Sequence, residues 1–295
     1  MDNERIEFYQ NRSFGERLSA AAEFLRQNWK VFYKNILIPA IPFLLLMAYL
    51  APQVMAEYTN MIQSLMTGDI SAIGGSRGMM PLFLLVSSLF SLYLYAMSAA
   101  IMKLYEEGNL TEKTSWGDLS SKMFSNAGKI FLVGLATGLI FFAGILVFAL
   151  LMGMLGGILA GIFSFLLIIG LIAAVFPMVL IIYPALFRGA STWESIKEGF
   201  SVGFKNWGTT FGIVFIVGIM AAIISYAFGV PYGIYMAFNP GEANVMTYVL
   251  SVLSSSATAL VTPFMVVFIA FHYFSITEKE EGVSLQNKID EFDNL

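Results

Sequence analysis

The sequence predicts an all-α integral membrane protein with six transmembrane helices, arranged as three hairpins that are each preceded by a cytoplasmic amphipathic interfacial helix. Of 295 residues, 58% are hydrophobic and 12% are charged, whereas soluble domains average about 45–50% and 25%. The charged residues gather in a few segments, and six long apolar runs separate them. The net charge of −4 is small and gives no indication of a nucleic-acid partner.

Each apolar run is long enough to cross a bilayer as a helix, which takes about 20 residues. The predicted spans cover residues 36–55, 80–104, 130–152, 158–187, 208–230 and 245–274. Residues 1–35 form a cytoplasmic N-terminal segment with an interfacial helix, and residues 275–295 form a cytoplasmic tail. Pro177, Pro184 and Pro263 predict kinks in the fourth and sixth spans.

The distribution of positive charge predicts that both termini are cytoplasmic. An even number of spans places the termini on one side, and fifteen of the sixteen Lys and Arg residues then lie on that side, with Arg77 alone outside. Short cytoplasmic loops carry such an excess of Lys and Arg. The four tryptophans flank the cytoplasmic ends of spans, as interfacial anchors do. These are Trp29, Trp116, Trp193 and Trp207.

The segments that lead into spans one, three and five share a layout. Each begins with a serine followed three residues later by an acid, in the pairs Ser13–Glu16, Ser115–Asp118 and Ser191–Glu194. This spacing is typical of a capping box at a helix start. Apolar residues then recur every three to four positions, which predicts an amphipathic helix. At a constant offset of 178, Glu16, Leu18, Asn28 and Trp29 match Glu194, Ile196, Asn206 and Trp207. We interpret the pattern as a threefold internal repeat.

Three stretches resemble uncharacterised bacterial multi-pass proteins related to the membrane region of glycerophosphodiester phosphodiesterases. They are residues 13–16 with Asn28 and Trp29, residues 191–207, and the tail 277–289, in which Glu280-Glu281-Gly282 is followed by Ser284-Leu285 and Lys288-Ile289. The resemblance covers most of the chain and implies a six-span bundle in a bacterial cytoplasmic (inner) membrane. The catalytic residues of those phosphodiesterases lie in a separate soluble barrel domain, which we expect to be missing here, so the resemblance does not carry the activity over.

The spans offer little reactive chemistry. Their central parts contain no ionisable residue, and the chain has no cysteine. We therefore predict no catalytic residue, no cofactor and no metal site. The single histidine, His272, is expected to be an interfacial residue rather than a proton carrier. An enzyme would need an acid and a base at the inner face, for which Glu106 with His272 is the available pair.

Hydroxyl side chains recur at helical spacing in spans two and six. They are Ser87, Ser91, Tyr95 and Ser98, and Ser251, Ser255, Thr258 and Thr262. Such hydroxyls usually bond to a backbone carbonyl or across a helix interface. The alternative is that they line a polar groove between the two spans. Glycines four residues apart, as in Gly134–Gly138 and Gly208–Gly212, predict close helix packing within the chain, with homodimerisation as the alternative.

These patterns favour a non-enzymatic multi-pass membrane protein, an accessory or scaffold subunit that contacts proteins or lipids through its cytoplasmic interfacial helices. Its expected partners are membrane lipids and a membrane or cytoplasmic protein, without nucleic acid. The alternative is a transporter or lipid-handling protein that holds its substrate in the groove between spans two and six.

Overall fold

The computed structural model describes residues 5–68, 78–155, 157–239, 242 and 244–283, and within these ranges its only regular structure is helical. The helices are α1 (Phe14–Thr67), α2 (Met79–Glu106), α3 (Trp116–Leu155), α4 (Gly157–Met178), α5 (Ile182–Phe187), α6 (Thr192–Lys205), α7 (Trp207–Phe238) and α8 (Val245–Glu281). Six helical stretches are long and apolar enough to cross a membrane, as predicted. Arg77 and the tail residues 284–295, including Ser284, Leu285, Lys288 and Ile289, lie outside the described residues.

The fourth predicted span is divided into two helices. α4 ends at Met178 and α5 begins at Ile182. Between them, Leu180 donates its N–H to the carbonyl of Pro177 at 3.1 Å, and Tyr183 donates to Leu180 at 3.2 Å, both bonds three residues back along the chain. Pro184 has no N–H and cannot continue the α-helical pattern. The kink predicted for this span is therefore a complete break, whereas α8 continues through Pro263 as one helix.

α6 packs against this break. The hydroxyl of Ser195, which is fully buried, accepts the N–H of Ala185 at 3.0 Å and donates to the carbonyl of Ile181 at 2.5 Å. It thus stands between the two groups that an unbroken helix would join directly. One and two turns along α6, Gly199 and Gly203 let the backbones meet. A Cβ on Gly199 would lie 2.4 Å from the Cα of Ile181.

Close glycine packing therefore occurs in α6 and not where the sequence predicts it. Cβ atoms added to Gly134, Gly138, Gly153, Gly161 and Gly208 would have no neighbour within 4 Å. A Cβ on Gly212 would meet only the ring of Phe14, at 3.0 Å. The prediction that these glycines mediate close helix packing within the chain is wrong, because most of them lie on helix surfaces that no other part of the chain covers.

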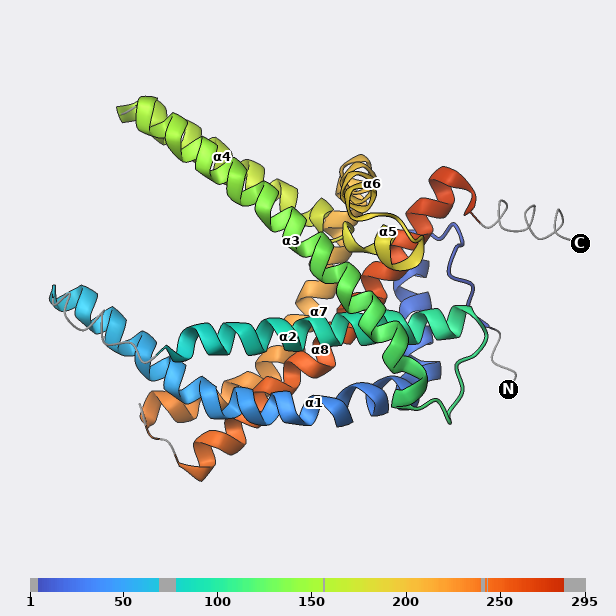
Figure 1. The fold of residues 1–295 in the computed structure, drawn as a ribbon, viewed down its shortest axis with the longest axis horizontal. Coiled ribbons are helices and arrows are strands. Elements are labelled where there is room, and N and C mark those ends of the chain that lie inside the picture. Colours follow the sequence, from blue (N-terminus) through green and yellow to red (C-terminus); the bar gives the residue numbers. More distant parts are fainter. Residues whose placement is uncertain (1–4, 69–77, 156, 240–241, 243, 284–295) are drawn as a thin grey trace, which may run out of the picture.

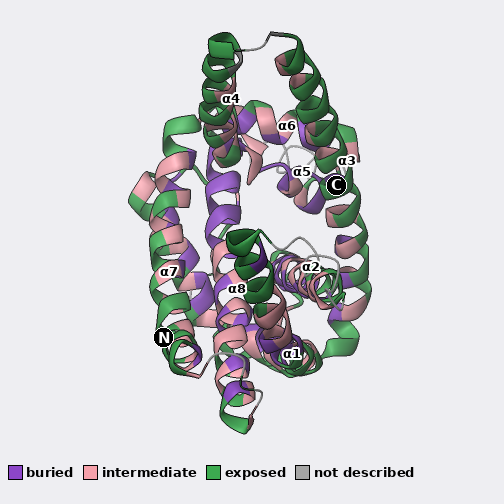
Figure 2. Ribbon diagram, turned by 90° about the vertical axis from the view of Figure 1, so that its left-hand side faces the viewer, coloured by how far each residue is buried: buried purple, intermediate pink, exposed green. Residues whose placement is uncertain are grey.

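The last third of α8 forms the centre of the molecule. Every residue from Val266 to Thr277 is buried, and Figure 2 shows α8 with buried residues along its length among the other helices. The first described residues complete this core. Phe8 is 5% exposed, and its ring stacks on Tyr105 and Phe274 with centroids 5.6 and 4.9 Å apart. The two described ends of the chain are joined here, because Arg12 donates its backbone N–H to Ser275 at 3.0 Å.

α1 is continuous from the charged N-terminal region into the first span. Its 54 residues correspond to a length of about 80 Å, far more than the ~30 Å of a hydrocarbon core. Pro39 lies inside the helix and leaves the carbonyl of Asn35 without its usual donor. The hydroxyl of Tyr93 on α2 donates to this carbonyl at 3.0 Å, as well as to that of Ile36. α2 therefore supplies the hydrogen bond that Pro39 removes.

α3 and α4 extend away from the other helices. Figure 1 shows them running side by side and diverging from the group of α1, α2, α7 and α8. Only 6% of the most apolar stretch of α3 is buried, against 44% for α8. A helix that is apolar on all sides and uncovered by protein is stable only in an apolar solvent. This pair accordingly has the surface expected of lipid-exposed helices.

A substitution at Gly199 tests the packing of α6 on the broken helix. Gly199→Ala would place a methyl group against the backbone of Ile181, which cannot rotate away, so we expect the free energy of unfolding to fall by about 1–3 kcal/mol. The matched control is Gly218→Ala in α7, where a Cβ meets nothing within 4 Å. Thermal or denaturant unfolding in detergent checks both. Equal stabilities for the two variants would contradict the close contact.

Candidate functional site

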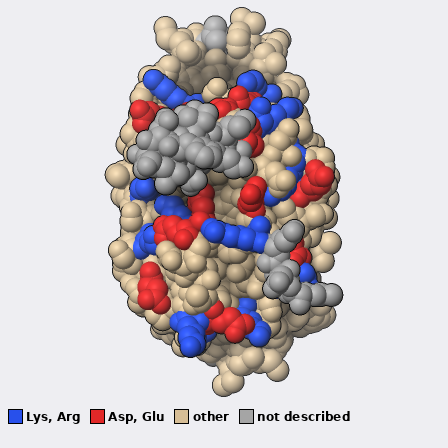
Figure 3. Space-filling model, turned by 90° about the vertical axis from the view of Figure 1, so that its right-hand side faces the viewer, with Lys and Arg blue, Asp and Glu red and all other residues tan. Residues whose placement is uncertain are grey.

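The described Lys and Arg residues and most of the described acids are collected on one end of the molecule, which we call the charged face. All described Lys and Arg residues fall in residues 5–34, 103–129, 188–205 and 279. Figure 3 looks onto this face and shows Lys and Arg mixed with Asp and Glu. Arg188 holds two elements together there, since it pairs with Glu198 of α6 and Glu281 of α8, each at 2.7 Å.

The three predicted capping pairs form their backbone-to-carboxylate bonds. The serine N–H donates to the acid at 2.7 Å in Ser13–Glu16, 2.7 Å in Ser115–Asp118 and 2.9 Å in Ser191–Glu194. Accepting this bond holds the pKa of the Glu194 carboxyl below its ordinary value. The backbone of Ser13 (φ −63°, ψ 167°) matches that of Ser191 (φ −63°, ψ 165°).

A second feature is shared at the offset of 178. Asn28 donates its side-chain amide to the carbonyl of Phe24 at 2.9 Å, and Asn206 donates to that of Val202 at 3.0 Å. The course of the helix after each asparagine differs, however: α1 continues beyond Asn28, whereas Asn206 separates α6 from α7. Figure 1 shows α6 end-on, so that it runs across the direction of the long helices.

A cavity of about 480 Å³ between α2, α3 and α5 is lined by several charged side chains, and we call it the lysine pocket. Its lining includes three lysines and two acids. They are Lys103, Lys122, Lys129, Glu106 and Glu107. The rest of the described lining consists of Ser121, Ser125, Asn126, Leu186, Phe187 and Gly189.

Hydrogen bonds fix part of the lysine pocket. Lys103 donates to the side-chain oxygen of Asn126 at 2.9 Å, and the amide of Asn126 donates to the carbonyl of Ala96 at 3.3 Å. Asn126 is 1% exposed, so its orientation is set by these two bonds. Lys122 forms an ion pair with Glu107 at 2.6 Å. The pocket therefore has an ordered wall made by α2 and α3.

His272 belongs to a separate buried network. Its Nδ1 lies 3.0 Å from a guanidinium nitrogen of Arg17, and its Nε2 lies 3.0 Å from the hydroxyl oxygen of Thr210. A guanidinium can only donate, so Nδ1 must be the acceptor. The neutral ring then carries its proton on Nε2 and donates it to Thr210. His272 thus links α1, α7 and α8 at the end of the bundle that carries the charged face.

These hydrogen bonds affect whether Glu106 and His272 could act as an acid–base pair. Both ring nitrogens of His272 are engaged, so pairing with Glu106 would require one of these bonds to break. Among the described residues no group of three or more His, Asp or Glu side chains could hold a metal ion.

The eight hydroxyl residues of the predicted groove lie on α2 and α8, which contact each other. Ser98 and Ser251 are buried, and Ser87, Ser91, Tyr95, Ser255, Thr258 and Thr262 are half-buried. Ser98 bonds back to the carbonyl of Leu94 at 2.6 Å, whereas the hydroxyl of Ser87 is buried without a partner in the described structure. The described lining of the lysine pocket includes none of these eight residues, and neither does that of a second cavity, between α1 and α7.

The four tryptophans are all exposed. The ammonium of Lys197 lies over the ring of Trp193, 5.1 Å from its centre. Trp207 donates its indole N–H to the carbonyl of Ala173 at 2.8 Å. The Trp116 ring lies 6.0 Å from that of Tyr93. Exposed aromatic rings beside charged side chains suit the boundary between water and hydrocarbon.

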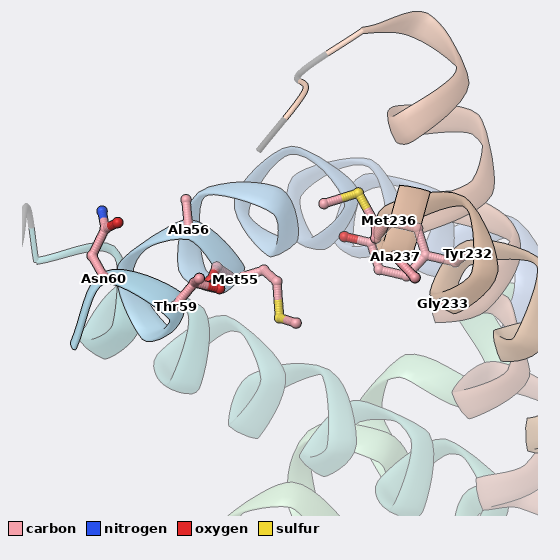
Figure 4. Close-up of a pocket in the computed structure, with 8 residues that line it drawn as sticks. All are labelled: Met55, Ala56, Thr59, Asn60, Tyr232, Gly233, Met236 and Ala237. Carbon is pink, nitrogen blue, oxygen red and sulfur yellow. Dashed lines mark hydrogen bonds between the residues drawn. The ribbon is translucent and has the colours of Figure 1, made fainter. Parts of the chain in front are cut away.

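A second cavity, of about 390 Å³, lies between α1 and α7 at the opposite end of the molecule. Figure 4 shows Met55 and Tyr232 on opposite sides of this space. The hydroxyl of Tyr232 is buried without a hydrogen-bond partner in the described structure. The described lining carries no charge, so this cavity offers far less for recognition than the lysine pocket.

The sequence reasoning missed the lysine pocket. Its lysines come from two helices and are separated by acids and apolar residues along the chain, so no cluster of cations is visible. A partial signal was available: Lys122 and Lys129 are two helical turns apart on the predicted interfacial helix and therefore share one face. Only the packing of α3 on α2 adds Lys103 to them.

The His272 network can be tested at Thr210. Thr210→Val keeps the shape of the side chain but removes the acceptor for Nε2–H, so we expect the free energy of unfolding to fall by about 1–3 kcal/mol. Thr210→Ser retains the hydroxyl and should stay within about 1 kcal/mol of the parent protein. Unfolding in detergent measures both, and a stable Thr210→Val variant would show that the bond is dispensable.

No protein-family model, curated protein or solved structure matches this chain.

Proposed function

We propose that this chain is a non-enzymatic multi-pass protein of the bacterial cytoplasmic membrane, an accessory or scaffold subunit whose charged face contacts a protein partner or lipid headgroups. In this proposal both termini are cytoplasmic, and the six spans form three hairpins. Each hairpin is preceded by an interfacial helical segment that begins at Ser13, Ser115 or Ser191. The segments after Ser13 and Ser115 continue into the span as one helix, and the segment after Ser191 is the separate helix α6.

The observation that carries the proposal is the collection of three capped helix starts and exposed tryptophans on one charged face. The matching backbone of Ser13 and Ser191 and the matching bonds of Asn28 and Asn206 support the repeat. α6 supports an interfacial role most directly, since it crosses the long helices and exposes Trp193 (Figure 1). Scaffold subunits need such surfaces but no reactive groups.

The transporter alternative has weaker support. It requires the hydroxyls of α2 and α8 to face a water-accessible cavity. The hydroxyl of Ser98 instead donates to a backbone carbonyl of its own helix, as hydroxyls in packed helices commonly do. The hydroxyl of Ser87, which is buried without a partner in the described structure, is an observation in its favour.

Orientation can be measured directly, because the chain contains no cysteine. Lys113→Cys lies on the charged face and Thr67→Cys at the end of α1, and both positions are exposed. In intact cells we expect a membrane-impermeant maleimide to label Thr67→Cys, and to label Lys113→Cys only after permeabilisation. The reverse result would place the charged face outside and overturn the assignment.

The partner can be tested by mild extraction and mass determination of the intact complex. We expect a companion protein at fixed stoichiometry that is lost when Trp193 and Lys197 on α6 are both replaced by Ala. The matched control is Tyr226→Ala, an exposed aromatic position on α7. A chain that arrives without a protein, but with one enriched small molecule, would overturn the scaffold proposal and favour the transporter.

A further inference from the structure

Two cations in the lysine pocket are not neutralised by an ion pair within the described part of the chain. Lys103 and Lys129 form no ion pair with any described residue, whereas Lys122 is paired with Glu107. Lys103 is also close enough to Lys129 for their ammonium groups to repel each other. Glu106 and Glu107, which follow Lys103 on α2, attract its ammonium group but form no ion pair with it.

Such an arrangement costs free energy unless an anion occupies the pocket. Both lysines are half-buried, and removing a cation from water without a counter-charge is unfavourable. Like charges in proximity add to this cost. The hydrogen bond that Lys103 donates to Asn126 uses only one of the three N–H groups of the Lys103 ammonium. The remaining donors are available to a ligand.

We propose that the lysine pocket binds a phosphate group, carried either by a phospholipid headgroup or by a soluble phosphate compound. Lysine ammonium groups bind phosphate as point charges, and hydrogen bonds between ionised groups are about twice as strong as neutral ones. The hydroxyls of Ser121 and Ser125 line the same cavity and have no hydrogen-bond partner in the described structure, so they can donate to phosphate oxygens. This site rests on the pocket alone and does not depend on a protein partner.

The charge of the pocket selects the kind of phosphate. Three lysines against two glutamates leave one net positive charge. That balance fits a phosphate diester with a single negative charge better than a dianion, which Glu106 and Glu107 would repel. A volume of about 480 Å³ accommodates a phosphate together with its ester groups.

The rest of the lining fits a lipid source. Leu186 and Phe187 add an apolar edge to an otherwise polar cavity. A diester headgroup could place its phosphate between Lys103 and Lys129 and its first carbon atoms against this edge. A soluble phosphate compound would use the lysines and serines only.

The test uses the full chain in nanodiscs that contain phosphatidylglycerol and phosphatidylcholine, followed by native mass spectrometry of the lipids retained. Titration with inorganic phosphate in detergent, at a pH low enough for the monoanion to predominate, forms the second arm. We expect Lys129→Gln to weaken binding by about tenfold. The matched control is Lys30→Gln, which removes the same charge from an exposed position on the same face, outside the pocket. Thermal unfolding verifies that both variants are folded.

The two arms separate the sources of phosphate. Retention of phosphatidylglycerol that is lost in Lys129→Gln but kept in Lys30→Gln assigns the site to a lipid headgroup. Saturable binding of inorganic phosphate with the same dependence on Lys129, without lipid retention, assigns it to a soluble compound. Absence of binding in both arms, or equal binding by the two variants, overturns the site.

Discussion

The structure depends on the requirement that every backbone polar group be satisfied where water is absent. At the break between α4 and α5, the hydroxyl of Ser195 both accepts from Ala185 and donates to Ile181. Within the hydrocarbon region each unsatisfied group would cost several kcal/mol. The break is therefore possible only because α6 approaches closely, which Gly199 permits. A short helix on the charged face thereby determines the path of the fourth span.

The same requirement explains how the remaining helices meet. Pro39 frees a carbonyl in α1, and Tyr93 of α2 bonds to it, so the proline creates a specific contact between two helices. At the charged face, Arg17 and Thr210 engage both nitrogens of His272, and this network joins α1, α7 and α8. Polar groups inside the bundle thus specify which helices are neighbours, while apolar contact supplies most of the buried area.

The charged face follows from these constraints. Its helices are held in position by caps, by the packing of α2 on α8 and by the packing of α3 on α2, so that the lysines of α2 and α3 come to line one cavity. The proposed scaffold role uses the exposed side of α6, and the proposed phosphate site uses the opening between α2, α3 and α5. Neither requires the chain to carry out chemistry.

The sequence by itself determined the class of the protein, the six apolar stretches and the three helix caps. Each of these depends on local properties: hydrocarbon thickness fixes the length of a span, and a serine reaches an acid three residues away on the same turn. The predicted spans begin within one residue of the starts of α2, α4, α7 and α8, and the cap at Ser13 marks the start of α1 at Phe14. The end of α1 was not predicted, because the helix continues to Thr67, twelve residues beyond the predicted end of the first span at residue 55. Only the tertiary structure decided that Ser195 fills the break near Pro184, that Gly199 and Gly203 rather than the spaced glycines of α3 pack tightly, and that Lys103 joins Lys122 and Lys129. These contacts connect residues distant in sequence, and their formation depends on how the helices pack, which no local pattern specifies.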